Sequence, residues 1–253
     1  MAYVTAAATA TRVCAVLAAA VACAAAAALP LPSYIKPCKI NDPGLNECSL
    51  KNGREAIPSI LKGDPKYRVP SMQPLVISEV SVADRGLNIT LRNVRLHGIS
   101  DIEFRSSVFD PKGKKFEWGF FLPRLEVLAD YQVDGKILVL PLKGSGPANI
   151  TLVDVPLTLK FEYELVKKED GKEYLNPTKA TPTFDTSRTY IQLDNLFNGD
   201  KLLGDNTNMF LNENWREVTT DVGPVIAQAI AEAVRQILSG IALQVPYEQL
   251  FIQ

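Results

Sequence analysis

The stretch VDVPLTLKFEYEL, residues 153–165, alternates apolar and polar side chains over its whole length. A period of two is typical of a β-strand with one buried face and one face in water. At about 3.3 Å per residue this strand exceeds about 40 Å, whereas most strands have about five or six residues. We expect the apolar set from Val153 to Leu165 to face inward, so the fold must offer a buried surface of that length.

The C-terminal part of the chain has the period of a helix instead. At about 1.5 Å per residue, a helix of about thirty residues spans about 45 Å, which matches the long strand. Gly223-Pro224 predicts a kink within it. The apolar positions recur at three- and four-residue spacing: Trp215, Val218, Val222, Val225, Ile226, Ala229, Ile230, Ala233, Val234, Ile237, Leu238 and Ile241.

The simplest way to bury both apolar stripes is to wrap a curved antiparallel sheet around the helix. We therefore predict an α+β fold. Residues 125–133 alternate in the same way, and Asp134-Gly135 predicts a tight turn into residues 137–142. Near Asn93 the apolar parity switches, which predicts a bulge.

The N-terminal end reads as a targeting segment. Arg12 is followed by an uncharged run rich in Ala, residues 13–29, that ends in small residues. This pattern is typical of a secretory signal peptide cleaved near residues 26–28, and a membrane anchor is the competing interpretation. We expect residues 1–28 to be removed, residues 29–253 to form a single domain, and the protein to be secreted and extracellular.

The charge balance argues against a polyanionic partner. Without residues 1–28 the chain has 26 Lys and Arg against 28 Asp and Glu, so the formal charge moves from -1 to -2. Nucleic-acid binding depends on an excess of cations, which is absent. Polar residues interrupt the apolar run 222–243, so we expect no stable membrane insertion.

The cysteines predict one disulfide. Cys14 and Cys23 lie in the predicted signal peptide, which leaves Cys38 and Cys48 as a pair in an oxidising compartment. A metal site is the weaker alternative because zinc usually requires four protein ligands and the chain has a single histidine, His97. We expect no metal.

Two glycosylation sequons begin at Asn88 and Asn149. Asn88 has the parity opposite to its apolar neighbours, so we expect a glycan there to project into solvent. Asn149 shares the inward parity of the long strand, so that sequon should stay unmodified unless the residue precedes the strand.

No arrangement of catalytic residues stands out. The sequence contains no nucleophile elbow, zinc-protease helix, phosphate-binding loop or calcium loop. A catalytic triad would have to use His97, which we expect to be an exposed turn residue. The carboxylates fall on the polar faces of strands. These observations predict a protein that is not an enzyme and needs no cofactor.

Aromatic residues on the inward faces could line a ligand pocket, although core packing explains most of them equally well. Tyr131 and Tyr163 are candidates to meet a polar end of the ligand, because a buried phenol usually finds a partner. The candidate ligand-binding residues are Phe104, Trp118, Phe120, Tyr131, Phe161, Tyr163, Val222, Ile226, Ile230, Val234 and Leu238.

The chain resembles the takeout and juvenile-hormone-binding-protein family of insects. The order and spacing of several motifs carry the resemblance: Cys38 and Cys48, 69–75, 94–98, 122–146, and 208–251 with Val245-Pro246-Tyr247. It implies a long C-terminal helix wrapped by a curved sheet around an elongated hydrophobic tunnel, similar to one half of the larger lipid-transfer and bactericidal/permeability-increasing proteins. By family motif, Tyr131 matches a tyrosine near the ligand. Hormone carriers have a second disulfide that this chain lacks, so it is more similar to the takeout branch.

Three functions remain open. The first is a carrier of a terpenoid, fatty acid or similar elongated lipid. The second is an extracellular signalling or interaction module that meets an unknown receptor through its surface, for which filling the cavity with Ala229→Phe or Ala233→Phe would leave activity unchanged. The third is an esterase that depends on His97.

Overall fold

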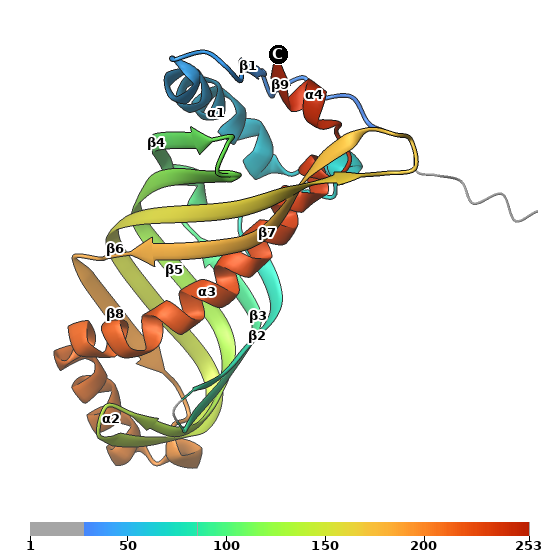
Figure 1. Ribbon diagram of the computed structural model, residues 1–253. Helices are drawn as coiled ribbons and strands as arrows, with labels where there is room; N and C mark the ends of the chain where they lie inside the picture. Colours follow the sequence, from blue (N-terminus) through green and yellow to red (C-terminus); the bar gives the residue numbers. More distant parts are fainter. Residues whose placement is uncertain (1–27, 85, 253) are drawn as a thin grey trace, which may run out of the picture.

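The structure, a computed structural model, describes residues 28–84 and 86–252. A strongly curved antiparallel sheet forms the body of the protein, and α3 (Trp215–Ala242) runs along the open side of the curve (Figure 1). This helix packs most extensively on the edge strand β7 (Glu173–Phe184) and also contacts β2 (Leu75–Asp84) at the other end of the strand order. The predicted α+β fold, a long C-terminal helix wrapped by a curved sheet, is confirmed.

The main sheet has seven strands in the order β2-β3-β5-β6-β7, with β4 paired to β5 and β8 paired to β6. A short parallel pair, β1 with β9, joins the two ends of the described chain. The remaining strands are β1 (Cys38–Lys39), β3 (Leu87–His97), β4 (Glu103–Asp110), β5 (Lys115–Ile137), β6 (Leu140–Lys167), β8 (Arg188–Leu193) and β9 (Phe251–Ile252).

The long predicted strand is part of an even longer hairpin. β5 has 23 residues and β6 has 28, and they pair without interruption of register from Ile137 opposite Leu140 to Lys115 opposite Glu162. Strands of this length curve around α3 and give the sheet its depth (Figure 1). The hairpin therefore runs along the whole length of the interior.

The turn predicted at Asp134-Gly135 is wrong, because the hairpin turns at 138–139. Gly135 lies inside β5 with φ 143°. A Cβ there would meet the carbonyl oxygen of Gly86 at 2.3 Å, so the glycine serves the close approach of the β2–β3 turn.

The inward face of the hairpin switches parity halfway along both strands. On β6 the cavity-lining residues are Ile150 and Leu152 before the switch and Val155 after it. Asp154, between them, has φ 48°, a left-handed conformation. After it, the residues that face inward change from even to odd numbers. The expectation that Val153 belongs to the inward set is therefore wrong.

The same switch corrects the second sequon. Asn149 lies within β6 and is exposed, and its Nδ2 donates to Glu126 Oε1 at 3.3 Å. The expected inward orientation of Asn149 is wrong, because the parity before Asp154 is opposite to the parity after it. Asn88 is exposed, as its own parity predicts.

The bulge predicted near Asn93 is confirmed. The register between β3 and β5 shifts between Arg92 and Arg95, and Asn93 has φ 52°. At the end of β3, His97 pairs with Glu126 and is half-buried. It is therefore a strand residue and not the exposed turn residue that we expected.

The disulfide between Cys38 and Cys48 is confirmed and fixes α1 (Leu45–Lys62) to the segment before it. The helix ends at Gly63, where φ is 86° and a Cβ would lie 2.7 Å from Ser71 N. α1 thereby covers one end of the curved sheet beside β4 (Figure 1). The predicted signal peptide, 1–28, lies outside the described residues except for its last position.

The C-terminal part contains α2 (Lys201–Glu213), α3 and the short α4 (Tyr247–Leu250), and not one helix. α2, which the periodicity does not predict, precedes α3. The predicted kink position, Gly223-Pro224, lies inside α3, which continues without a break. By length and composition α3 would suffice to cross a membrane, contrary to expectation, yet in this fold it packs along the sheet.

The polar residues of α3 attach it to the edge of the sheet. Gln228 Nε2 donates to the Ala180 carbonyl at 2.8 Å, and Arg235 Nη1 donates to the Pro177 carbonyl at 2.5 Å. Seven helical residues and three strand residues both span about 10 Å, so the two bonds have the same spacing. The residues that interrupt the apolar run thus satisfy free carbonyls of β7.

Candidate ligand-binding site

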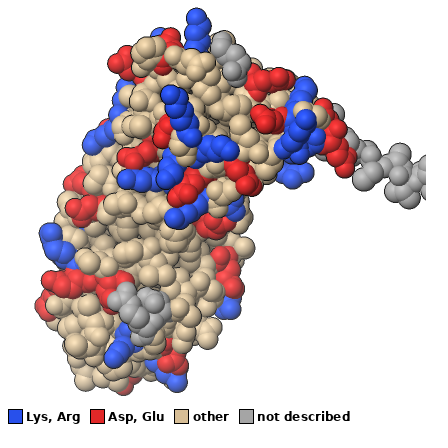
Figure 2. Space-filling model, viewed as in Figure 1, with Lys and Arg blue, Asp and Glu red and all other residues tan. Residues whose placement is uncertain are grey.

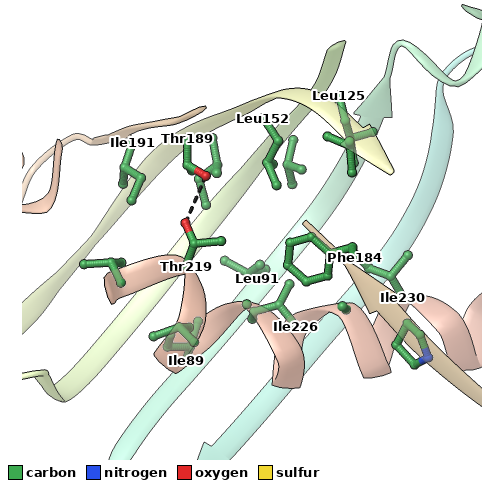
Figure 3. A pocket seen from close by; sticks show the side chains of 18 of the residues that line it. Ile89, Leu91, Leu125, Leu152, Phe184, Thr189, Ile191, Thr219, Ile226 and Ile230 are labelled. Atoms are coloured by element: carbon green, nitrogen blue, oxygen red, sulfur yellow. Dashed lines mark hydrogen bonds between the residues drawn. The ribbon is translucent and has the colours of Figure 1, made fainter. Parts of the chain in front are cut away.

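A partly open cavity lies between α3 and the inner face of the sheet. Its volume is about 230 Å³. Figure 3 shows side chains from several strands and from α3 around the space, with Leu152 and Thr189 of the sheet opposite Thr219 and Ile226 of the helix. We call it the aliphatic cavity; its wall includes Leu125, Leu152, Ile191, Val222, Ile226 and Ile230.

The wall of the aliphatic cavity carries almost no polar group. Among the described residues, no Asp, Glu, Lys, Arg or His side chain lines it. Its polar exceptions are the hydroxyls of Thr189 and Thr219, which lie 2.9 Å apart, and the phenol of Tyr131. The cavity therefore suits an uncharged, largely apolar molecule.

The Tyr131 hydroxyl is already bonded. It donates to the Asp194 carbonyl at 2.7 Å and so joins β5 to the segment after β8. Burial raises the pKa of Tyr131 to about 12, and the Asp194 carboxylate adds to the shift, so the phenol stays neutral. Its ring lines the cavity while its oxygen serves the fold.

A second cavity of about 250 Å³ lies beneath α1, and we call it the aromatic cavity. Phe104 stacks on Phe120 with ring centroids 5.0 Å apart, and Trp118 meets Phe104 edge-on at 6.1 Å. Phe116 stacks on Phe109 at 5.4 Å. These rings come from β4 and β5, whose pairing brings them onto one face.

The structure divides the predicted ligand-binding residues between the two cavities. Five line the aliphatic cavity: Tyr131, Val222, Ile226, Ile230 and Val234. Four line the aromatic cavity: Phe104, Trp118, Phe120 and Leu238.

The other two predicted residues, Phe161 and Tyr163, line neither cavity. Phe161 is fully buried, with its ring 4.8 Å from Phe116 and 5.4 Å from Trp118. The buried Tyr163 hydroxyl has no hydrogen-bond partner among the described residues. Burial raises the pKa of Tyr163, and the neighbouring Tyr247 adds to the shift. Both residues lie in the packed core between sheet and helix.

Sequence reasoning missed several residues of the wall. Thr189 belongs to β8, a six-residue strand that the pattern does not reveal. Thr219 follows Trp215 by four residues and precedes Val222 by three, so the helical spacing could have placed it on the inward face. Ala227 and Ala231 line the aliphatic cavity, whereas Ala229 and Ala233, the positions suggested for filling it, do not.

Neither cavity brings together the side chains of a catalytic centre. His97 lines neither of them. Within residues 28–84 and 86–252, no three His, Cys, Asp or Glu side chains group in a way that could hold a metal ion. What the arrangement can do is enclose an apolar molecule.

Comparisons with known proteins agree with this geometry. Residues 15–252 match the family model described as haemolymph juvenile hormone binding protein. The chain is 30% identical over 234 residues to the "Circadian clock-controlled protein daywake" of Drosophila melanogaster, covering 87% of this chain and 88% of that protein. The protein of the same name from Drosophila yakuba is 27% identical over 231 residues, with the same coverage.

A solved structure has the same fold. Takeout 1 of Epiphyas postvittana superposes with a TM-score of 0.76 at 28% sequence identity. The match covers 87% of this chain and 100% of that one.

Proposed function

Because the chain belongs to the haemolymph juvenile hormone binding protein family, we propose that it is a secreted carrier that reversibly binds a small, elongated hydrophobic ligand. The aliphatic cavity is the observation that carries this proposal. A void lined from both helix and sheet by apolar side chains gains free energy when an apolar molecule enters it, at about 25 cal/mol per Å² of buried apolar surface. The fold shared with Takeout 1 supports the same reading.

The proposal includes three features that rest on the sequence. Residues 1–28 are removed as a signal peptide, residues 29–253 act as one lipid-binding domain, and Asn88 carries a glycan. The confirmed disulfide and the exposed position of Asn88 are consistent with an extracellular protein. The ligand is a terpenoid, a fatty acid or a similar lipid.

The proposal assigns no reaction to the protein. A histidine-dependent esterase would have to bring its substrate to His97, and a molecule held in either cavity does not contact that residue. The wall of the aliphatic cavity offers hydroxyls without a neighbouring base.

Filling the aliphatic cavity tests the proposal. Ala227 faces the void from α3, so Ala227→Phe places a ring where the ligand would lie. We expect the affinity for the apolar fluorescent probe N-phenylnaphthylamine to fall about tenfold or more, since the loss of two buried methylenes alone is worth about 1.6 kcal/mol. Fluorescence titration measures the affinity, and native mass spectrometry of the purified wild type should show a bound lipid.

The matched control is Ala233→Phe, which adds the same ring to α3 at a position that lines neither cavity. It should bind the probe as the wild type does. Circular dichroism establishes that both variants fold, and Ala227→Leu provides a smaller obstruction. A wild-type protein that releases no lipid and binds no probe would refute the carrier function.

A further inference from the structure

The wall of the aliphatic cavity contains a pair of hydrogen-bonded hydroxyl groups that connects α3 to the sheet. Thr219 comes from the second turn of α3 and Thr189 from β8, and their Oγ1 atoms lie 2.9 Å apart (Figure 3). Thr189 is only 3% exposed. Both residues line the cavity, and around them the wall is built of Leu, Ile, Val and Phe.

The pair has more donor hydrogens than it uses. Two hydroxyls carry two hydrogens, and a bond between them consumes one. The neighbouring Thr220 donates to the Arg216 carbonyl of its own helix at 2.8 Å. Thr219 donates to Thr189 of the sheet and makes no such bond within its helix. Within the described residues neither member of the pair has another hydrogen-bond partner, so one hydrogen is left over at the wall of the cavity.

Packing alone does not account for this pair. A buried hydroxyl costs free energy when its hydrogen has no acceptor, and valine has the same shape without that cost. A bond between the two hydroxyls also polarises the second one, which makes it a better donor. The arrangement is what a site requires when it is to donate one hydrogen bond to a ligand.

We propose that Thr189 and Thr219 together anchor a single oxygen atom of the ligand, with Thr189 as the donor and Thr219 as its polarising partner, and that the ligand is therefore a neutral molecule with a hydrogen-bond acceptor. This inference rests on the carrier function proposed above and specifies its ligand. The aliphatic body of the molecule fills the space between α3 and the sheet, and its oxygen accepts from the hydroxyl pair.

The ligand is neutral because the cavity holds nothing to balance a charge. No Lys, Arg or His side chain lines it among the described residues, and the Tyr131 phenol already donates to Asp194. A carboxylate would be buried without a cation, which is far more costly than burying a neutral oxygen. A fatty acid is thereby disfavoured relative to its ester or to a ketone of equal length.

Three probes of equal chain length test the anchor: undecane, methyl nonyl ketone and undecanoic acid. Their affinities are measured at neutral pH by displacement of N-phenylnaphthylamine. In the wild type the ketone should bind more tightly than undecane, and undecanoic acid most weakly.

Because Thr219 donates to Thr189, the spare hydrogen belongs to Thr189. Thr189→Val should therefore weaken ketone binding about tenfold, as expected for one lost hydrogen bond, and change undecane binding by less than about twofold. Thr219→Val keeps the donor and removes only its polarisation, so it should weaken ketone binding by less than Thr189→Val does.

The controls separate an anchor from a merely structural pair. Thr220→Val removes a hydroxyl that faces away to its own helix and should leave all three affinities unchanged. Thr189→Ser keeps the donor hydroxyl and should bind the ketone as the wild type does. Equal losses for ketone and undecane in the valine variants would overturn the anchor, and tight binding of undecanoic acid would overturn the neutral ligand. Failure of the wild type to bind any probe would instead count against the carrier function.

Discussion

Gly53 lies in the middle of α1, where glycine is about 1 kcal/mol less favourable than alanine. The reason for its presence is the ring of Phe104, because a Cβ on Gly53 would lie 2.5 Å from Phe104 Cε1. That ring is already held by Phe120 and Trp118 in the wall of the aromatic cavity. The absence of a side chain at Gly53 thus leaves room for the Phe104 ring of the aromatic cluster.

We expect Gly53→Ala to destabilise the protein although it improves helix propensity. The displaced Phe104 ring costs about 1 to 3 kcal/mol against a propensity gain of about 1 kcal/mol, which leaves a net loss of up to about 2 kcal/mol. Urea unfolding measures the difference. Gly204→Ala in α2 is the control, because its Cβ would have no neighbour nearer than 3.8 Å, and it should raise the free energy of unfolding by about 0.5 to 1 kcal/mol. A Gly53→Ala protein as stable as the control variant would contradict this account.

At the scale of elements, α2 completes the exposed side of β8. Asn208 accepts from Leu193 N and donates to Leu193 O, both at 2.9 Å, and Asn212 makes the same two bonds to Ile191 at 3.0 and 2.6 Å. Four helical residues rise about 6.0 Å and two strand residues about 6.6 Å, so the two amides match the strand. The side chains of a helix thereby replace a missing neighbouring strand.

Asn212→Ala should therefore be severely destabilising for a polar residue. It leaves the N–H and C=O of Ile191 without partners, at about 1 to 3 kcal/mol each. Asn206→Ala on the same helix removes an exposed side chain and should stay within about 0.5 kcal/mol of the wild type. Because Ile191 and Thr189 line the aliphatic cavity, probe affinity should fall with stability. Thermal unfolding curves of the two variants that coincide would argue against this role.

The sequence predicts the elements whose periodicity is long and uninterrupted. α3, residues 125–133 of β5 and residues 153–165 of β6 follow from it, as does the bulge at Asn93. The full length of the two strands does not follow, because the predicted turn between them lies at Asp134-Gly135. The sequence does not predict α2, because two of the three buried residues of that helix, Thr207 and Asn208, are polar, while Leu202 and Met209 are exposed. Helical periodicity in apolar residues is then absent although the helix is well bonded.

The site was harder to predict than the fold for a related reason. Asp154 reverses the inward parity of β6 through its backbone conformation. Leu152 and Val153 are both apolar, so the sequence does not show which of them faces inward. The Tyr131 hydroxyl has its partner 63 residues away, so the sequence could not show that it is occupied. Inward residues were predicted as a class, but their division between two cavities depends on the curvature of the sheet.

At the scale of the whole molecule, the interior consists of two spaces of different chemistry that come close to each other. On α3, Val234 lines the aliphatic cavity and Leu238, one turn later, lines the aromatic cavity. On the sheet, Trp118 pairs with Leu159, which lines the aliphatic cavity. On the face seen in Figure 2 the charged residues gather in patches. The side chains at which the two cavities approach each other, Val234 and Leu238 on α3 and Leu159 and Trp118 on the sheet, are apolar.

The two tryptophans of the chain allow this division to be measured. Trp118 lines the aromatic cavity, whereas Trp215 lies against Arg188 and Arg216 and lines neither cavity. In Trp215→Phe, the emission of Trp118 therefore reports on the aromatic cavity alone. The wild type serves as control, because losing Trp215 should not change ligand affinity.

We expect a series of methyl ketones of increasing length to show two regimes in Trp215→Phe. While the chain fits the aliphatic cavity, each added methylene should raise affinity roughly fourfold, from about 0.8 kcal/mol of burial, and leave Trp118 emission unchanged. Longer chains must pass Trp118 and Phe120, whose packed rings have to move, so the gain per methylene should fall as the emission shifts. A shift with the shortest ketone would mean that ligands enter the aromatic cavity first, and a constant slope without any shift would mean that the two spaces never communicate.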